Sequence, residues 1–478
     1  MLRRVVVLLL CALAAAPAFA RLPAPVVAEL KRAGIPSSSV ALVVQDVNDA
    51  APLVSHNADR AMNPASVMKL ITGFAALELL GPAYTWRTEV YLDGPLEDGV
   101  LHGDLILKGY GDPKLTVERF WLLLKELRAR GLRDIKGDLV LDRSYFDPGM
   151  HDAARFDREP LRPYNVGADA LLLNFKAVRF AFIPDPHTRT VNILSQPPLA
   201  QLRLENEVAT VEGPCEDWRR DIKPLVAEEG DRVTVRFAGA MPDQCDTRHW
   251  ALALLPADKF AWGMFHAMWH ELDGTLSGSV RDGLVPLGAV PFAVLESQSA
   301  AEAVRDMNKY SSNVIARQLF LTISAERQPP GRYDTSAEIV RDWLAERGLA
   351  MPELSIENGS GLSRIARVSA GNLVRLLIAA YRSPVMPEFI ASLPLVAADG
   401  TMQKRLQYSA VAGQAHVKTG SLNDVRSLAG YVDTEDGRRL AFAFIVNHPQ
   451  AAASQAAQDE LLRWLYRDAP RHHRHRRR

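Results

Sequence analysis

The pattern of apolar and turn-forming residues changes twice along this chain of 478 residues, and that change constrains the fold more than any other feature. Near the start, apolar residues recur with helical spacing over residues 64–80. From about residue 88 to residue 260, short β-type runs alternate with Gly, Pro and Asp turns. Helical spacing returns after residue 280. This mixture excludes an all-helical or all-strand protein, so we expect a multidomain α+β fold.

Individual elements follow from the same periodicities. The best-defined helix has Asn63 as its N-cap, Pro64 at its first position and Gly81-Pro82 as its stop signal. Asp436-Gly437 is typical of a turn between two closing strands. The expected strands are 40–45, 104–108, 138–142, 190–194, 232–237, 427–433 and 439–447, and the expected helices are 64–80, 117–130, 300–324, 335–347 and 369–382.

The balance of charge excludes one class of function. Lys and Arg number 56, and Asp and Glu also number 56, so the formal net charge is zero. Nucleic-acid-binding proteins usually carry a basic excess, and strong attraction to an anionic membrane needs one too. We therefore expect no nucleic acid partner and at most peripheral membrane association. After the first twenty residues no 18 consecutive residues are apolar, which predicts a soluble mature protein.

The first twenty residues are typical of a cleaved export signal. Arg3 and Arg4 precede an apolar run over residues 5–16, and Ala18-Phe19-Ala20 matches a signal-peptidase site. The alternative is a membrane anchor, but the apolar run is shorter than the ~20 residues that span a bilayer. We therefore expect residues 1–20, including Cys11, to be removed and the protein to be periplasmic.

Two cysteines remain in the mature chain, Cys215 and Cys245. In an oxidising compartment, two cysteines 30 residues apart are expected to form one disulfide, although two buried thiols remain the alternative. Metal binding by them is the weakest option, since neither a CxxC pattern nor a nearby histidine pair accompanies them.

Two other segments could be mistaken for binding sites. His266 and His270 are spaced i, i+4 on a predicted helix, but the H-E-x-x-H order of a zinc helix is missing. We expect histidines packed on a helix face and no metal site. The final residues 469–478 are rich in Arg and His and are expected to form a disordered basic tail.

Ser66 and Lys69 form the first candidate catalytic pair. They stand three positions apart at the start of the predicted helix, so their side chains share a face. A lysine whose pKa is lowered by a cationic neighbour can accept the proton of a serine nucleophile. Free N–H groups of the first helical turn can stabilise an oxyanion. Taken alone, the pair would equally suit an ordinary surface helix.

Two later segments carry complementary chemistry. Ser311-Ser312-Asn313 presents a hydroxyl and a carboxamide, although an ordinary N-cap serine would look the same. Lys418-Thr419-Gly420-Ser421 can bind a carboxylate, and its glycine lets a substrate backbone approach closely; the alternative is a turn with an exposed lysine. In the order S-x-x-K, S-x-N, K-T-G, the three segments are the signature of penicillin-binding proteins and serine β-lactamases.

The chain resembles the class C low-molecular-mass penicillin-binding proteins, the D-alanyl-D-alanine carboxypeptidase/endopeptidase family, from about residue 37 to residue 447. Asn358 is a departure, since the family pattern has Asp there. Further matching segments are Gly103-Asp104-Leu105, Lys108-Gly109-Tyr110-Gly111-Asp112-Pro113, Tyr164-Asn165, Asn358-Gly359-Ser360-Gly361-Leu362-Ser363, Asp399-Gly400-Thr401 and residues 421–431.

The resemblance implies a fold and a domain order. The fold would be a penicillin-binding/β-lactamase-like transpeptidase domain, an antiparallel sheet flanked by helices, split into residues 21–86 and 262–468. A β-rich insertion at residues 87–261, made of two subdomains, would lie between the first two motifs. Ser311 follows Ser66 by 245 residues, whereas β-lactamase-like proteins have a far shorter interval, so the spacing disfavours a β-lactamase.

The resemblance also implies a reaction. A periplasmic serine DD-peptidase would remove the terminal D-Ala of peptidoglycan stem peptides and could cleave D-Ala cross-links. Ser66 would form an acyl-enzyme with Lys69 as proton acceptor, and Ser311 would relay a proton to the leaving amine. The same serine would be acylated by β-lactam antibiotics. No cofactor is expected.

The remaining motif residues would bind substrate. Asn313 would hold Lys69 and the substrate amide, and Lys418 would lower the pKa of the base and attract the terminal carboxylate. Thr419 and Ser421 would hydrogen-bond that carboxylate or the acyl chain, and Gly420 would leave room for it. Two alternatives remain, a β-lactamase and a non-catalytic peptidoglycan-binding module. The sequence leaves open the oligomeric state and the balance between trimming and cross-link cleavage.

Overall fold

The structure is a computed structural model that describes residues 21–470 except residues 186 and 231. The predicted signal peptide at 1–20 and the basic run at 471–478 lie outside the described residues. No helix within the described part is long and apolar enough to cross a membrane.

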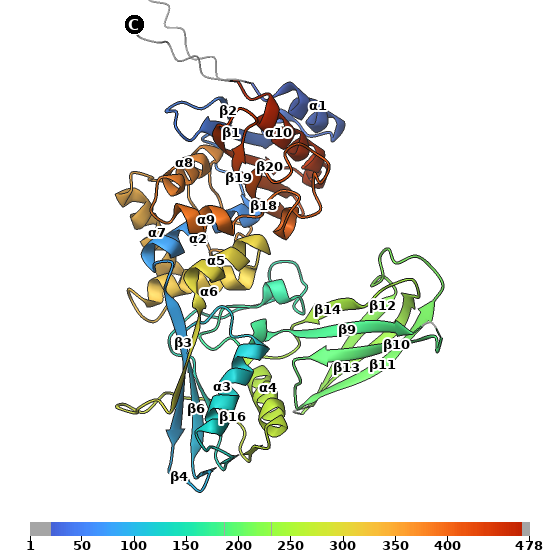
Figure 1. The fold of residues 1–478 in the computed structure, drawn as a ribbon, viewed down its shortest axis with the longest axis vertical. Helices are drawn as coiled ribbons and strands as arrows, with labels where there is room; N and C mark the ends of the chain where they lie inside the picture. Colours follow the sequence, from blue (N-terminus) through green and yellow to red (C-terminus); the bar gives the residue numbers. More distant parts are fainter. Residues whose placement is uncertain (1–20, 186, 231, 471–478) are drawn as a thin grey trace, which may run out of the picture.

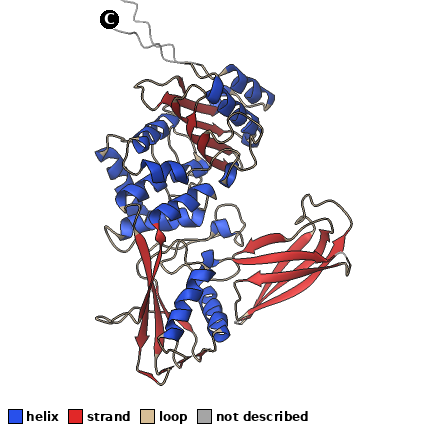
Figure 2. Cartoon of the chain, viewed as in Figure 1, coloured by secondary structure: helices blue, strands red, loops and turns tan. Residues whose placement is uncertain are grey.

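A five-stranded antiparallel sheet forms the centre of one half of the molecule (Figures 1 and 2). The strand closest to the N-terminus, β1 (Val40–Asp46), pairs with the last strand, β20 (Arg439–Asn447). Ala41 and Val43 face one hydrophobic core, whereas Leu42 and its even-numbered neighbours face another. This alternation is what a sheet covered on both faces requires. The other strands are β18 (Ala415–Leu422), β19 (Val425–Asp433) and β2 (Val54–His56), in the order β18-β19-β20-β1-β2.

Helices cover both faces of this sheet. On one side α1 (Ala24–Arg32) packs against α10 (Gln455–Arg467), and on the other α8 (Ala370–Tyr381) lies against β1 and β20. Beyond α8 lies a layer of further helices, in which α6 is buried along its whole length. These helices are α2 (Lys69–Leu79), α5 (Ala300–Lys309), α6 (Asn313–Ala325), α7 (Tyr333–Glu346) and α9 (Met386–Ser392).

Two predicted helices differ from the structure, and both differences lie at the candidate site. The expected helix 64–80 begins with a 3₁₀ turn, Ala65–Met68, because Ala65 has φ +46° and cannot continue an α-helix from Pro64. The expected helix 300–324 is two helices, because Ser311 adopts φ +56° between them. Ser312 then caps α6 through its side chain.

The β-rich part contains two larger sheets (Figure 1). One has five strands in the order β16-β8-β6-β3-β17, and α3 (Val117–Ala129) and α4 (Ala257–Glu271) pack on its face. The other has six strands in the order β12-β13-β11-β10-β9-β14. The strands of these and of a smaller sheet are β3 (Thr85–Asp93), β4 (Leu96–Glu97), β5 (Val100–Leu101), β6 (Asp104–Gly109), β7 (Asp134–Ile135), β8 (Leu139–Asp142), β9 (Val178–Asp185), β10 (Thr190–Gln196), β11 (Leu202–Val211), β12 (Ile222–Glu229), β13 (Arg232–Pro242), β14 (Arg248–Leu252), β15 (Thr275–Leu276), β16 (Val280–Asp282) and β17 (Ala293–Ser299).

The β-rich part leaves and re-enters the helical layer on adjacent strands. Thr85 of β3 lies opposite Ser299 of β17, and the two strands are antiparallel. Limits at residues 87 and 261 would separate these paired strands and cut through α4. We therefore propose an insertion from about residue 85 to residue 299, and its two larger sheets support a division into two subdomains.

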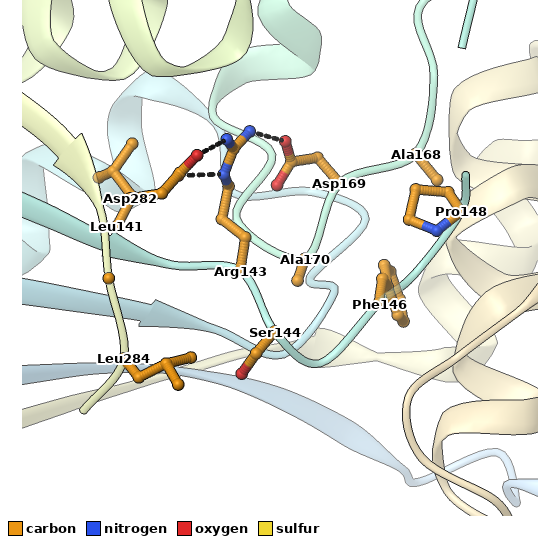
Figure 3. Close-up of a pocket in the computed structure, with 11 residues that line it drawn as sticks. Leu141, Arg143, Ser144, Phe146, Pro148, Ala168, Asp169, Ala170, Asp282 and Leu284 are labelled. Atoms are coloured by element: carbon orange, nitrogen blue, oxygen red, sulfur yellow. Dashed lines mark hydrogen bonds and ion pairs between the residues drawn. The ribbon is translucent and has the colours of Figure 1, made fainter. Parts of the chain in front are cut away.

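Two sets of contacts hold the insertion together and in place. Cys215 and Cys245 form a disulfide at the six-stranded sheet, which confirms the predicted bond. Arg143 lies between Asp169 and Asp282 (Figure 3), with N–O distances of 2.8 and 2.7 Å. Next to it the insertion meets α6, where Gln318 accepts the N–H of Asp169 at 3.0 Å. The insertion is thus anchored to the helix that begins at Asn313.

Candidate active site

Ser66 lies in the 3₁₀ turn that precedes α2, and Lys69 is the first residue of α2. Residues three apart in a 3₁₀ turn stand directly above one another. The Lys69 Nζ atom therefore reaches Ser66 Oγ, at 2.9 Å. The predicted common face of the two side chains is confirmed, although a 3₁₀ turn rather than an α-helix creates it.

The surroundings of Lys69 favour its neutral form. The side chain is fully buried, and its Nζ atom also contacts Asn313 Oδ1 at 2.7 Å and the Ser360 carbonyl at 2.6 Å. Burial lowers the pKa of Lys69 well below its usual value, and the charges of Lys418 and Arg317 lower it further. A neutral amine has two N–H bonds for those two acceptors and one lone pair. That lone pair is left to accept the proton of the Ser66 hydroxyl.

A second serine–lysine pair faces the same cleft. Lys418 lies on β18, fully buried, and its Nζ donates to Ser311 Oγ and to the Thr419 carbonyl, both at 2.8 Å. Burial lowers the pKa of Lys418 to about 7. Ser311 reaches this lysine from the break between α5 and α6. Both hydroxyls of the two pairs line one cleft of about 330 Å³.

The edge strand β18 forms one wall of this cleft. Thr419, Gly420 and Ser421 line it, and the Thr419 hydroxyl lies 2.9 Å from the hydroxyl of Thr401. A Cβ atom at Gly420 would collide with Ser427 Oγ and would lie 3.1 Å from the backbone nitrogen of Ser66. The absence of a side chain therefore serves the protein itself, because it lets β18 approach the turn that carries Ser66.

Asn313 connects the site to the insertion. Its Oδ1 accepts from Lys69, and its Nδ2 donates to the Tyr164 carbonyl at 3.3 Å. The same carbonyl accepts from Arg317 at 3.1 Å, one turn further along α6. Sequence reasoning missed Arg317, although a charged residue in an otherwise apolar helical run was a usable signal. It also missed the Ser360 carbonyl, which carries no side-chain signal.

The other sequence candidates lie elsewhere. His266 stacks on Trp262 with ring centroids 4.9 Å apart, whereas His270 is exposed, so the prediction of two packed histidines is wrong for His270. Histidines one turn apart on an amphipathic helix need not be equally buried, and only His266 lies against a neighbouring ring. Within residues 21–470, leaving aside 186 and 231, no group of three or more His, Cys, Asp or Glu could hold a metal ion.

Comparison with known proteins identifies the group to which this chain belongs. The model of the D-Ala-D-Ala carboxypeptidase 3 (S13) family matches residues 24–468. The chain belongs to this family. It is 28% identical over 440 residues to a D-alanyl-D-alanine carboxypeptidase of Actinomadura sp. strain R39, covering 88% of this chain and 80% of that protein. It is 25% identical over 421 residues to the D-alanyl-D-alanine carboxypeptidase DacB of Haemophilus influenzae, and the match covers 86% of this chain and 85% of that protein.

Solved structures share the fold of this chain. Penicillin-binding protein 4 (dacB) of Haemophilus influenzae matches with a TM-score of 0.76 at 22% identity, covering 92% of this chain and 99% of that one. A predatory endopeptidase of Bdellovibrio bacteriovorus matches with a TM-score of 0.54 at 16% identity, covering 89% of this chain and 93% of that one. The predicted family and multidomain α+β penicillin-binding fold are confirmed. The S13 protein is an enzyme of the serine-type D-Ala-D-Ala carboxypeptidase class.

Proposed function

We propose that this S13 enzyme is a periplasmic serine DD-peptidase that works through a serine acyl-enzyme. It removes the terminal D-Ala from peptidoglycan stem peptides, cleaves D-Ala cross-links and is acylated by β-lactams. The observation that carries the proposal is the buried amine of Lys69, 2.9 Å from Ser66 Oγ, with its N–H groups directed to Asn313 and Ser360.

In the acylation step, Ser66 Oγ attacks the carbonyl carbon between the last two D-alanines, and its proton passes to Lys69 Nζ. Backbone N–H groups of Ser66 and Ser421 stabilise the oxyanion, each contributing about 3–4 kcal/mol. The C–N bond breaks, and the leaving amine takes a proton from the hydroxyl of Ser311, which Lys418 restores. Water then attacks the ester carbonyl and passes a proton through Ser311 to Lys418, and the ester C–O bond breaks as Ser66 Oγ takes back the proton held by Lys69.

Substrate binding follows from the charges around the cleft. The terminal carboxylate lies near Lys418 and hydrogen-bonds Thr419, whose hydroxyl is already oriented by Thr401. Ser421 hydrogen-bonds the carboxylate or the acyl chain. Asn313 holds Lys69 and, through its amide, the substrate. No cofactor takes part in these steps, because the protons move between the substrate, water and the side chains of Ser66, Lys69, Ser311 and Lys418.

A labelled penicillin tests the proposal. We expect one fluorescent penicillin per molecule, attached at Ser66, and no labelling of Ser66→Ala, while Ser38→Ala at an exposed serine labels normally. The wild type should release D-Ala from a pentapeptide, and the exported protein should begin at Arg21. An unlabelled folded protein would contradict the proposal. Rapid penicillin turnover would indicate a β-lactamase, and wall binding without D-Ala release would indicate a non-catalytic module.

A further inference from the structure

The catalytic cleft runs along the part of β18 from Thr419 to Ser421. At one end Leu422, next to Ser421, packs with Phe156 and Leu362. At the other end Thr419 contacts Thr401. Under the proposed function the carboxylate of the leaving residue lies at Thr419. Thr401 and Arg405 line the cleft beside Thr419, so a group attached beyond the leaving residue would meet the chain that follows Thr401.

A second hollow, of about 520 Å³, lies along that chain. Three basic residues line it, Lys404, Arg463 and Arg467, together with the fully exposed ring of Tyr408. None of its lining residues in the described part is acidic. Arg463 pairs with Glu460 of its own helix, whereas neither Lys404 nor Arg467 has an ion-pair partner among the described residues. The hollow therefore offers uncompensated positive charge.

The hollow and the cleft share the same two walls. Arg405 lines the cleft, and Lys404, the residue before it, lines the hollow. In the same way Gln458 of α10 lines the cleft and Arg467 of α10 lines the hollow. Arg405 ties the two walls together, since its guanidinium pairs with Asp459 of α10, with Nε–Oδ1 at 3.1 Å. The side-chain nitrogen of Gln458, which is almost fully buried, has no hydrogen-bond partner among the described residues.

The length of this path defines what it can hold. From Gln458 to Arg467 the helix rises about 13 Å, at about 1.5 Å per residue. An extended peptide covers that distance with about four residues. A single D-Ala leaving group covers only one residue of this length, whereas a second stem peptide with free carboxylates can span it and has the opposite charge.

We propose that this hollow, lined by Lys404, Tyr408, Arg463 and Arg467, binds the acidic stem peptide on the leaving side of a cross-link. This inference rests on the proposed function and adds to it a binding subsite for the second peptide of a cross-link. The D-Ala carbonyl is attacked by Ser66, and the amine of the second peptide is the leaving group. The hollow holds that second peptide and so favours endopeptidase over carboxypeptidase turnover.

Charge reversal of the two unpaired cations tests the inference. We compare wild type, Lys404→Glu/Arg467→Glu and the control Lys223→Glu, which reverses an exposed lysine of the six-stranded sheet. The substrates are a purified cross-linked peptide dimer and a monomeric pentapeptide. For the double variant we expect kcat/KM for the dimer to fall about tenfold. The value of kcat/KM for the pentapeptide and the rate of penicillin acylation should be unchanged. The wild-type preference for the dimer should also weaken as salt is raised.

Each outcome decides one question. Loss confined to the dimer supports the leaving-side subsite. Unchanged dimer cleavage, or equal loss on both substrates, overturns it. If the wild type trims the pentapeptide but does not cleave the dimer, the subsite is also overturned, while D-Ala release and penicillin labelling still support a DD-carboxypeptidase. If the wild type shows neither penicillin labelling nor D-Ala release, the proposed function itself is refuted. If the proposed function is refuted, binding to Ser66→Ala still tests the hollow. The dimer should then bind more tightly than the monomer, and the Lys404→Glu/Arg467→Glu substitutions should remove that difference.

Discussion

Replacing Arg317 by Met should move the acid limb of acylation to higher pH. Arg317 is 4% exposed, and its guanidinium is held by the carbonyls of Tyr164 and Val166 rather than by a carboxylate. The side chains of Tyr333 and Glu357 face it, and it lowers the pKa values of both Lys69 and His151. Arg317 is thus a permanent positive charge near the proposed base. Without it, Lys69 holds its proton more tightly, and less free amine is available to accept the proton of Ser66.

The size of the effect follows from the geometry. Asn313 and Arg317 are one turn of α6 apart, and Asn313 Oδ1 lies 2.7 Å from Lys69 Nζ. One turn rises about 6 Å, so the two charges are on the order of 8 Å apart. At an effective dielectric constant of about 20 their repulsion is about 2 kcal/mol. On the acid limb, where wild-type Lys69 is also protonated, the variant should be acylated about 30-fold more slowly.

The assay is the rate of acylation by a fluorescent penicillin between about pH 5 and pH 10. The deficit of Arg317→Met should shrink as pH rises, because both proteins then hold Lys69 neutral. Arg317→Lys keeps the positive charge, so the acid limb of its pH profile should stay at the wild-type pH, although it loses part of the hydrogen bonding to Tyr164. Thermal unfolding checks that each variant is folded. The reasoning is refuted if a folded Arg317→Met keeps the wild-type acid limb, or if Arg317→Lys moves it as far.

Three further predictions follow from single contacts. Asn313→Ala removes the 2.7 Å bond to Lys69 and should slow acylation about 10- to 100-fold at every pH; unchanged acylation would exclude a positioning role. Gly420→Ala places a methyl group against Ser427 Oγ and forces β18 away from Ser66, so the melting temperature and the acylation rate should both fall; an unchanged acylation rate would show that β18 tolerates the shift. Replacing Cys215 and Cys245 by Ser opens a 30-residue loop and should reduce the free energy of unfolding by about 3–4 kcal/mol in urea titrations, while native acylation is retained; unchanged stability would show that the bond does not constrain the unfolded chain.

Periodicity predicted most of the regular structure. The strand 439–447 matches β20 at both ends, and the helix 117–130 matches α3 to within one residue. The prediction failed where single residues adopt left-handed backbone conformations. Ala65 and Ser311 both have positive φ, and neither is a residue type that indicates such a conformation. Tertiary contacts hold these strained residues in place, so the sequence pattern carried no sign of them.

The motif residues were predictable, but the groups that complete the site were not. Ser66, Lys69, Ser311 and Lys418 stand in fixed motif positions, and the structure brings all four to one cleft. The limits of the insertion were harder to predict from the sequence, because the pairing of β3 with β17 joins residues some 200 positions apart. Local patterns contain no information on such pairing.

By itself, the sequence determined the residue types, their order and the family, because these depend on local spacing and on three motifs in fixed order. Only the tertiary structure decided the electrostatics of the site. Folding buries Lys69, places Lys418 and Arg317 nearby and sets its amine against Ser66, which suits it to the proposed role of base. Desolvation and charge proximity are properties of three-dimensional packing, so the same lysine in the unfolded chain would remain an ordinary cation.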